Sequence, residues 1–224
     1  MQRDVDLKEI SDGRLYTRKD MVRVGCRDCE GCSSCCRGME DTIVLDPYDI
    51  WQMGIGLQNG FESLLNRAFE LVLTEGVILP HLKTLGKEEQ CVFLGANGRC
   101  TIHPYRPGIC RLFPLARIYE EDDFRYFIQV HECPATGKSK VRIEKWLGIP
   151  DLPAYEAYLK RWHAILRKTR EKVNDQKMDE ERRQKLLMLI LRLFYERIDP
   201  SYPFYEQFEM RAGLYEEEYL KVSQ

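Results

Sequence analysis

The feature that most constrains this chain is a run of cysteines near its N-terminus. Five cysteines fall within eleven residues, at positions Cys26, Cys29, Cys32, Cys35 and Cys36. Free thiols packed this closely oxidise easily and add little to a hydrophobic core, so the run needs another cause. Thiolate sulfur is the soft ligand that selects zinc and iron–sulfur clusters, and a two-residue gap lets a short turn bring consecutive thiolates onto one centre. The run therefore predicts a metal site.

The run fits two ligand patterns. Cys26, Cys29, Cys32 and Cys36 have gaps of two, two and three residues, the spacing of bacterial ferredoxins without their final proline. The last four cysteines instead give a C-x2-C-x2-C-C pattern. Because successive side chains of an extended segment point in opposite directions, we expect Cys35 and Cys36 to serve different metal centres, or different irons of one cluster. The C-x3-C-x2-C spacing of radical S-adenosylmethionine enzymes does not occur in the chain.

Size and composition are those of a globular protein. The 224 residues suit one domain or two small ones, and 44% apolar with 31% charged residues suit a real core and a charged surface. The net charge of −2 gives no reason to expect a nucleic-acid partner. The first residues lack an apolar signal region, and the longest apolar run, residues 186–191, is too short to span a membrane. We therefore expect a cytoplasmic protein, in which cysteines bind metal more readily than they form disulfides.

The other four cysteines lie between residues 91 and 133. The sequence Gly-Ala-Asn-Gly between Cys91 and Cys100 is typical of a hairpin turn, which would bring these two thiols together. Cys110 lies in a proline-bounded piece of one or two helical turns. A hairpin expected over residues 115–130 leads to Cys133, and the proline after it is common beside iron–sulfur ligands.

The rest of the sequence predicts helices and short strands. Strands are expected over residues 21–24 and 42–45, and helices over 46–54, 59–76, 141–147, from 151 past 166, 179–198 and 203–221. We interpret the Gly-rich residues 54–60 as a connection. Because no cysteine follows residue 133, we predict an α-rich α+β fold in two parts: a Cys-rich metal-binding domain with short strands at 1–136, and a helical domain at 137–224 docked on it.

Four motifs together suggest a family. They are C-x2-C-x2-C-C at residues 29–36, the block from Cys91 to His103, Arg-Pro-x2-Cys-Arg-x-Phe-Pro at 106–114, and Cys-Pro at 133–134. With these motifs the chain resembles the CxxCxxCC cysteine-cluster family of zinc- or iron-chelating domains. The resemblance implies eight cysteine ligands, Cys29, Cys32, Cys35, Cys36, Cys91, Cys100, Cys110 and Cys133, and leaves Cys26 as an addition. Some proteins with this pattern are named flagellin lysine N-methylases, although no S-adenosylmethionine site is evident in this sequence.

The kind and number of metal centres stay open at this point. The dense run and the excess of thiol over histidine favour at least one [4Fe–4S] cluster, and the cysteines are numerous enough for one or two metal centres. The C-x2-C pairs of the run also suit closed zinc sites. Arg106 and Arg111, which flank Cys110, would bind the cofactor by donating hydrogen bonds to cluster sulfur, or would bind an anion; otherwise they are surface or helix-capping residues. His103 is either a further ligand or a hydrogen-bonding neighbour.

Three functions are compatible with such a site. A redox module would hold a cluster with complete cysteine ligation, and an enzyme of protein modification would keep one coordination position open. A protein-interaction module would use closed zinc as a structural staple. We expect a protein partner or protein substrate, but no catalytic pair, triad or phosphate loop identifies a reaction, so the sequence leaves open whether the protein is an enzyme.

Overall fold

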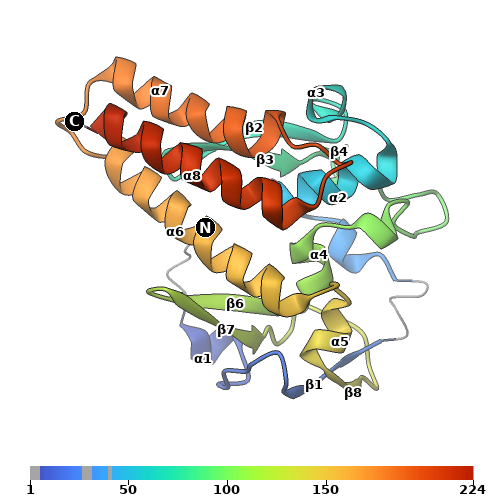
Figure 1. Cartoon of the computed structure of the whole chain (residues 1–224). Helices are drawn as coiled ribbons and strands as arrows, with labels where there is room; N and C mark the ends of the chain where they lie inside the picture. The colour runs from blue at the N-terminus through green and yellow to red at the C-terminus, as the bar shows by residue number, and fades with distance from the viewer. Residues whose placement is uncertain (1–5, 27–31, 40–41, 224) are drawn as a thin grey trace.

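Three long helices form one layer of the protein. The computed structural model describes residues 6–26, 32–39 and 42–223. Helices α6 (Leu152–Val173), α7 (Glu180–Leu191) and α8 (Phe204–Ser223) lie side by side, and α7 runs opposite to the other two (Figure 1). The hairpin of β2 (Phe69–Thr74) and β3 (Val77–Leu82) packs through β3 against α6 and α7. The predicted α-rich α+β fold and the three C-terminal helices are confirmed.

The strands of the described residues form four separate antiparallel pairs. Besides β2–β3, these are β1 (Met21–Gly25) with β8 (Ser139–Arg142), β4 (Thr84–Leu85) with β5 (Gln90–Cys91), and β6 (Leu115–Glu120) with β7 (Asp123–Ile128). The predicted strand at 21–24 and the predicted hairpin at 115–130 are confirmed. Strand β1 pairs across the expected boundary at residue 136, so a sheet joins the two predicted domains, whose division stays a prediction.

The remaining helical elements are short, apart from α2. They are α1 (Leu7–Ile10), η2 (Ser34–Cys36), α2 (Pro47–Leu57), α3 (Phe61–Leu64), η3 (His103–Tyr105), α4 (Gly108–Leu112), α5 (Ile143–Leu147) and η4 (Arg192–Glu196), a π-helical turn that continues α7. No helix of the described residues is long and apolar enough to cross a membrane.

Helix α2 begins where the sequence predicts and ends later. Asp46 caps it by accepting a hydrogen bond from the backbone N–H of Asp49, whose side chain accepts one from the N–H of Asp46 in return. The helix continues to residue 57, so the interpretation of the whole stretch 54–60 as a connection is wrong. Gly56 is required where it lies, because a Cβ there would come within 2.3 Å of the ring of Tyr105.

The helix predicted over 59–76 is wrong. Only the short α3 is helical, and β2 follows it, with Glu75 and Gly76 at the turn into β3. Both turn residues have positive φ, at 51° and 85°, which is the geometry of a two-residue hairpin turn. The pleat of β2 leaves Leu73 67% exposed.

The strand predicted over 42–45 is reduced to a single bridge. Val44 pairs with His81 of β3, and the N–H of Leu45 donates to the carbonyl of Pro80 at 2.9 Å. The N–H of Leu82 donates to the carbonyl of Ile43 at 2.8 Å. The segment that leads into α2 is therefore fixed along the edge of the β2–β3 hairpin.

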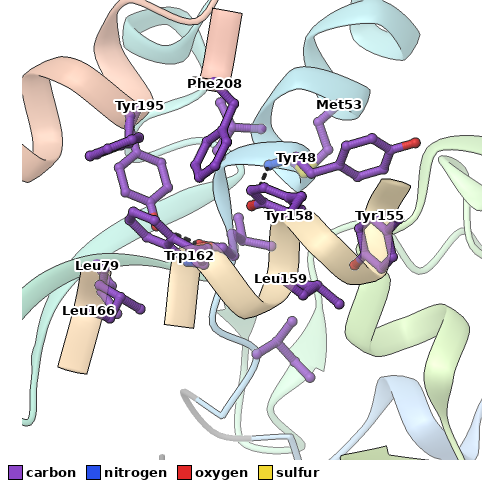
Figure 2. Packing of buried hydrophobic residues seen from close by; sticks show 14 of the residues in the cluster. Tyr48, Met53, Leu79, Tyr155, Tyr158, Leu159, Trp162, Leu166, Tyr195 and Phe208 are labelled. Atoms are coloured by element: carbon purple, nitrogen blue, oxygen red, sulfur yellow. Dashed lines mark hydrogen bonds between the residues drawn. The ribbon is translucent and has the colours of Figure 1, made fainter. Parts of the chain in front are cut away.

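Aromatic side chains fill the core between α2 and the helical layer (Figure 2). Tyr48 of α2 lies edge-on to Tyr155 and to Phe204, each with ring centroids 5.0 Å apart. Its backbone N–H donates to the hydroxyl of Tyr158 at 3.2 Å. The hydroxyl of Tyr195, in η4, donates to the carbonyl of Leu45 at 3.1 Å. These contacts bind the start of α2 to the C-terminal helices.

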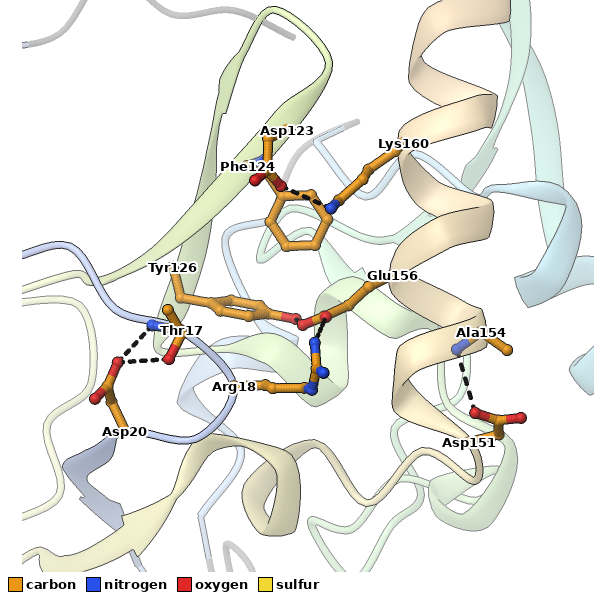
Figure 3. A network of polar contacts seen from close by, with 10 residues as sticks. All are labelled: Thr17, Arg18, Asp20, Asp123, Phe124, Tyr126, Asp151, Ala154, Glu156 and Lys160. Atoms are coloured by element: carbon orange, nitrogen blue, oxygen red, sulfur yellow. Dashed lines mark hydrogen bonds and ion pairs between the residues drawn. The ribbon is translucent and has the colours of Figure 1, made fainter.

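A polar network fastens the segment before β1 to α6 (Figure 3). Glu156 of α6 accepts hydrogen bonds from Arg18 at 2.6 Å and from the hydroxyl of Tyr126 in β7 at 2.9 Å. Further along α6, Lys160 pairs with Asp123 at 2.8 Å. The β6–β7 hairpin is therefore held between the N-terminal segment and the helical layer.

Candidate metal centre

Five cysteines from three segments of the described chain lie near one another. Cys35 and Cys36 belong to η2, Cys91 ends β5, Cys100 pairs with Leu94 in a single bridge, and Cys110 lies in α4. Cys35 and Cys36 share a hydrogen bond, and Cys35 interacts electrostatically with Cys91, Cys100 and Cys110. We call Cys35, Cys36, Cys91, Cys100 and Cys110 the five-thiol group.

The turn predicted between Cys91 and Cys100 is present. The N–H of Gly98 donates to the carbonyl of Gly95 at 2.9 Å, and the N–H of Thr101 donates to the carbonyl of Phe93 at 2.8 Å. The flanking pieces form one bridge rather than two strands. Cys91 and Cys100 nevertheless interact electrostatically, as the predicted turn requires.

A contact outside the turn brings the cysteine run to Cys91. The guanidinium of Arg37, directly after Cys36, donates to Glu88 at 2.6 Å and to Gln90 at 3.0 Å. The N–H of Gly38 donates to the carbonyl of Glu88 at 3.0 Å. Since Gln90 directly precedes Cys91, these bonds hold the end of the run beside β5.

Two sets of hydrogen bonds fix the segment that carries Cys110: Arg111 donates one set, and Asp49 accepts the other. The guanidinium of Arg111 donates to the carbonyl of Arg106 at 3.2 Å and also to that of Pro104. The N–H of Gly108, the first residue of α4, donates to the carboxylate of Asp49 at 2.7 Å. Asp49 lies within the helix predicted over residues 46–54, and its link to α4 was not predicted.

A hydrogen bond joins the side chains of the adjacent cysteines Cys35 and Cys36. Their mutual hydrogen bond lowers the pKa of Cys35 to about 7 and raises the pKa of Cys36. The nearby charge of Arg106 further lowers the pKa of Cys35. Because the thiolate is the form of cysteine that ligates metals, the lowered pKa of Cys35 favours metal ligation near neutral pH.

The other three thiols favour their protonated forms. Burial raises the pKa of Cys91, Cys100 and Cys110, and the charges of neighbouring thiolates raise each of them further. A group of thiolates in such surroundings needs a cation to balance its charge. The electrostatics of the five-thiol group therefore suit a bound metal.

The two candidate arginines occupy different positions. The charge of Arg106 acts on Cys35 and on Cys100, and its guanidinium also contacts the ring of His103. Burial lowers the pKa of Arg111, whose guanidinium donates hydrogen bonds to the backbone carbonyls of Arg106 and Pro104. The structure thus brings Arg106 to the thiols and gives Arg111 a part in holding η3 and α4 together.

The remaining predicted ligands are not part of the five-thiol group. Cys26 directly follows β1, the thiol of Cys32 lies 3.7 Å from the hydroxyl of Ser34, and the carbonyl of Cys133 accepts a hydrogen bond from Lys138 at 2.9 Å. Cys29 lies outside the described residues. The assignment of all nine cysteines as ligands stays a prediction.

The donor set of the five-thiol group fits a thiophilic metal. Among the described residues, no three His, Cys, Asp or Glu side chains converge in the geometry of a bound ion, so ligation would require these thiols to turn toward a common centre. All five donors are sulfur, and five exceeds the four that a tetrahedral zinc or a [4Fe–4S] cluster needs. Zinc and iron–sulfur clusters are the centres that such a set selects.

The fold and the gathered thiols define a cysteine-cluster protein. Residues 28–134 match the model of the CxxCxxCC family, which is described as "Putative zinc- or iron-chelating domain". The resemblance drawn from the sequence motifs is confirmed. The description supports a metal-binding cysteine cluster and leaves the kind of centre open. No curated protein and no solved structure matches the chain.

Proposed function

We propose that the five-thiol group is the core of a metal centre and that this centre is a [4Fe–4S] cluster. The observation that carries the proposal is the meeting of η2, the turn from Cys91 to Cys100, and α4, whose five thiols interact electrostatically although they span residues 35 to 110. Metal-binding thiolates are the common reason for such a meeting. The dense cysteine spacing in the run favours iron–sulfur ligation over zinc.

The proposed role of the cluster is electron transfer with a protein partner. Five thiols are available in the group, and complete cysteine ligation of a [4Fe–4S] cluster needs about four. A cluster with no open coordination position transfers electrons, whereas a cluster that binds substrate keeps one iron free of thiolate. Protein modification, as in a lysine N-methylase-related enzyme, is therefore the proposal's alternative, and a non-sulfur ligand to one iron would favour it.

A closed structural zinc site is the second candidate. The family description names zinc beside iron, and burial of the thiols is equally suited to a four-thiolate zinc staple. In that case the metal would hold the Cys-rich half together, and the C-terminal helices would contact a protein partner. Zinc gives no visible absorption, so colour and metal content separate the two candidates.

The test is metal analysis of protein purified without oxygen. The proposal expects brown protein with iron and acid-labile sulfide in equal amounts, and an electron paramagnetic resonance signal after reduction. Mössbauer spectra of the same material show whether every iron is held by sulfur. Colourless protein with stoichiometric zinc would replace the cluster by the zinc site, and protein that binds neither metal after reconstitution would overturn both.

The ligand pattern is tested by serine substitutions. Replacing Cys36 or Cys110 should weaken metal binding to a measurable degree without abolishing it, because both belong to the five-thiol group and four of its thiols remain in each variant. Cys26→Ser is the matched comparison, since Cys26 completes only the ferredoxin-like pattern. Full metal content in C26S favours the C-x2-C-x2-C-C pattern, and loss of metal there favours the ferredoxin-like one.

A further inference from the structure

Asp49 makes contacts that a helix-capping carboxylate does not need. It is 3% exposed, and one oxygen accepts the N–H of Asp46 at 3.0 Å, which completes the capping box of α2. The other oxygen accepts the N–H of Gly108 at 2.7 Å, from an element 59 positions away in the chain. The carboxylate thus connects the start of α2 to the start of α4.

Helix α4 depends on such outside contacts. It has five residues, and a helix this short does not hold its own conformation in water. Gly108, its first residue, is also pressed against α6, because a Cβ there would lie 2.2 Å from the hydroxyl of Tyr155. Asp49 and Tyr155 together therefore set the position of the first turn of α4.

Cys110 is carried by that turn. It lies two residues after Gly108 in α4, and the charge of Asp49 acts on its thiol. Ligand atoms of a metal site must be held to within a few tenths of an ångström of their productive position, and groups behind the ligands usually do this. The only described hydrogen bond from the start of α4 to α2 is the one from Gly108 to Asp49.

We propose that Asp49 is a positioning residue of the metal centre, which orients Cys110 by accepting the hydrogen bond of Gly108. This inference rests on the proposed function of the five-thiol group and adds a residue that does not itself touch the metal. A partner behind a ligand typically changes metal affinity about 10- to 100-fold, so an effect of about that size is expected.

The test compares Asp49→Ala with Asp49→Asn and Asp46→Ala in metal-loaded full-length protein. Asp49→Ala removes the acceptor of Gly108, while Asp49→Asn keeps an oxygen that can accept the bond. Asp46→Ala is the matched control, because it removes the cap of the same helix and leaves the contact with Gly108. Metal affinity, measured by competition with a chelator, should fall at least about tenfold in D49A, less in D49N, and least in D46A. Equal loss in D49A and D46A would show a purely structural effect and overturn the inference.

A double-mutant cycle with Cys110→Ser asks whether Asp49 acts through Cys110. If it does, D49A lowers metal affinity in the wild-type background and has less than about a twofold effect in the C110S background. Equal effects in the two backgrounds would contradict the inference. Should D49A fail to fold, the same cycle is measured with D49N, whose smaller effect should also vanish in C110S.

The result separates this inference from the proposed function. Wild-type protein that binds no metal refutes the metal centre itself. Wild-type protein that binds metal, together with independent effects of D49A and C110S, refutes only the role of Asp49. The visible spectrum per bound metal is a second readout, because displaced sulfur ligation changes it and lost stability alone does not.

Discussion

The side chain of Arg37 donates a hydrogen bond to Gln90 across 53 positions of the chain. The residue after Cys36 is thereby bound to the residue before Cys91, and the two parts of the five-thiol group are brought together by protein contacts. The gathering of these thiols is therefore a property of the fold as well as of any metal that binds there.

Removing that contact should loosen the site and leave the fold intact. In Arg37→Ala the exposed pair with Glu88 and the bond to Gln90 are lost, and an exposed ion pair stabilises a protein by about 0–1 kcal/mol. We expect little change in the unfolding temperature and faster release of metal to a chelator. Arg142→Ala, which breaks the exposed pair with Glu144, is the control and should release metal at the wild-type rate. Identical release rates in R37A and wild type would show that Arg37 does not support the site.

Gly108 should not tolerate a methyl group while Tyr155 is present. In Gly108→Ala the new Cβ would lie 2.2 Å from the hydroxyl of Tyr155, and overpacking of this kind costs about 1–3 kcal/mol. Tyr155→Phe removes that hydroxyl, which is buried without a hydrogen-bond partner in the described structure, so the single change should cost little. The double variant should regain most of the stability that G108A loses in urea unfolding. If the stability losses of the two single variants add up in the double variant, the strain in G108A does not come from the contact with the Tyr155 hydroxyl.

Metal binding should weaken on acidification. Burial raises the pKa of Cys91, Cys100 and Cys110, so the metal-free site keeps its protons to a higher pH than ordinary thiols do. Metal must displace these protons; its apparent affinity therefore rises with pH, and binding releases protons into the solution. Competition with a chelator at about pH 6 and about pH 8, with correction for the chelator's own protonation, measures the effect. An affinity that does not change between these conditions would exclude buried thiols as the ligands.

Glu156 should contribute more to stability than the exposed pair beside it. Glu156→Ala removes the acceptor of both Arg18 and Tyr126, and hydrogen bonds to a mostly buried charged group contribute about 1–3 kcal/mol (Figure 3). Asp123→Ala removes the exposed pair with Lys160 and the hydrogen bond that the Asp123 carboxylate accepts from the backbone N–H of Phe124. Because this carboxylate is exposed, about 0–1 kcal/mol is expected. Urea unfolding of the two variants gives the comparison. Equal stability of the two would mean that the network around Glu156 does not hold the N-terminal segment to α6.

Local signals in the sequence were sufficient for several parts of the fold. Asp46 and the proline after it mark the start of α2, and the turn between Cys91 and Cys100 follows from two glycines and an asparagine. The apolar spacing of residues 61–72 fits a helix. Residues 69–74 form a strand instead, because they pair with β3. Strand β3 follows β2 after the two-residue turn at Glu75 and Gly76, so the wrong prediction came from weighing the apolar spacing and not this turn.

A different limit applies to the candidate site, where the decisive contacts are long-range. The cysteine spacings identified the thiols, and the turn explained how Cys91 and Cys100 meet. The contact from Arg37 to Gln90, which holds the cysteine run beside Cys91, and the contact from Gly108 to Asp49, which fixes the start of α4, each join residues more than fifty positions apart. An arginine after a cysteine and an aspartate in a helix cap look like ordinary surface and capping residues until the fold places them.

The most direct test is to measure iron, zinc and sulfide in protein purified without oxygen, beside a variant in which Cys36, Cys91 and Cys110 are all serine. The wild-type chain should hold about four irons and about four sulfides per cluster, and the variant should hold almost none. A wild-type chain that stays free of metal after reconstitution, or a variant that binds as much metal as the wild type, would contradict a metal centre built from the five-thiol group.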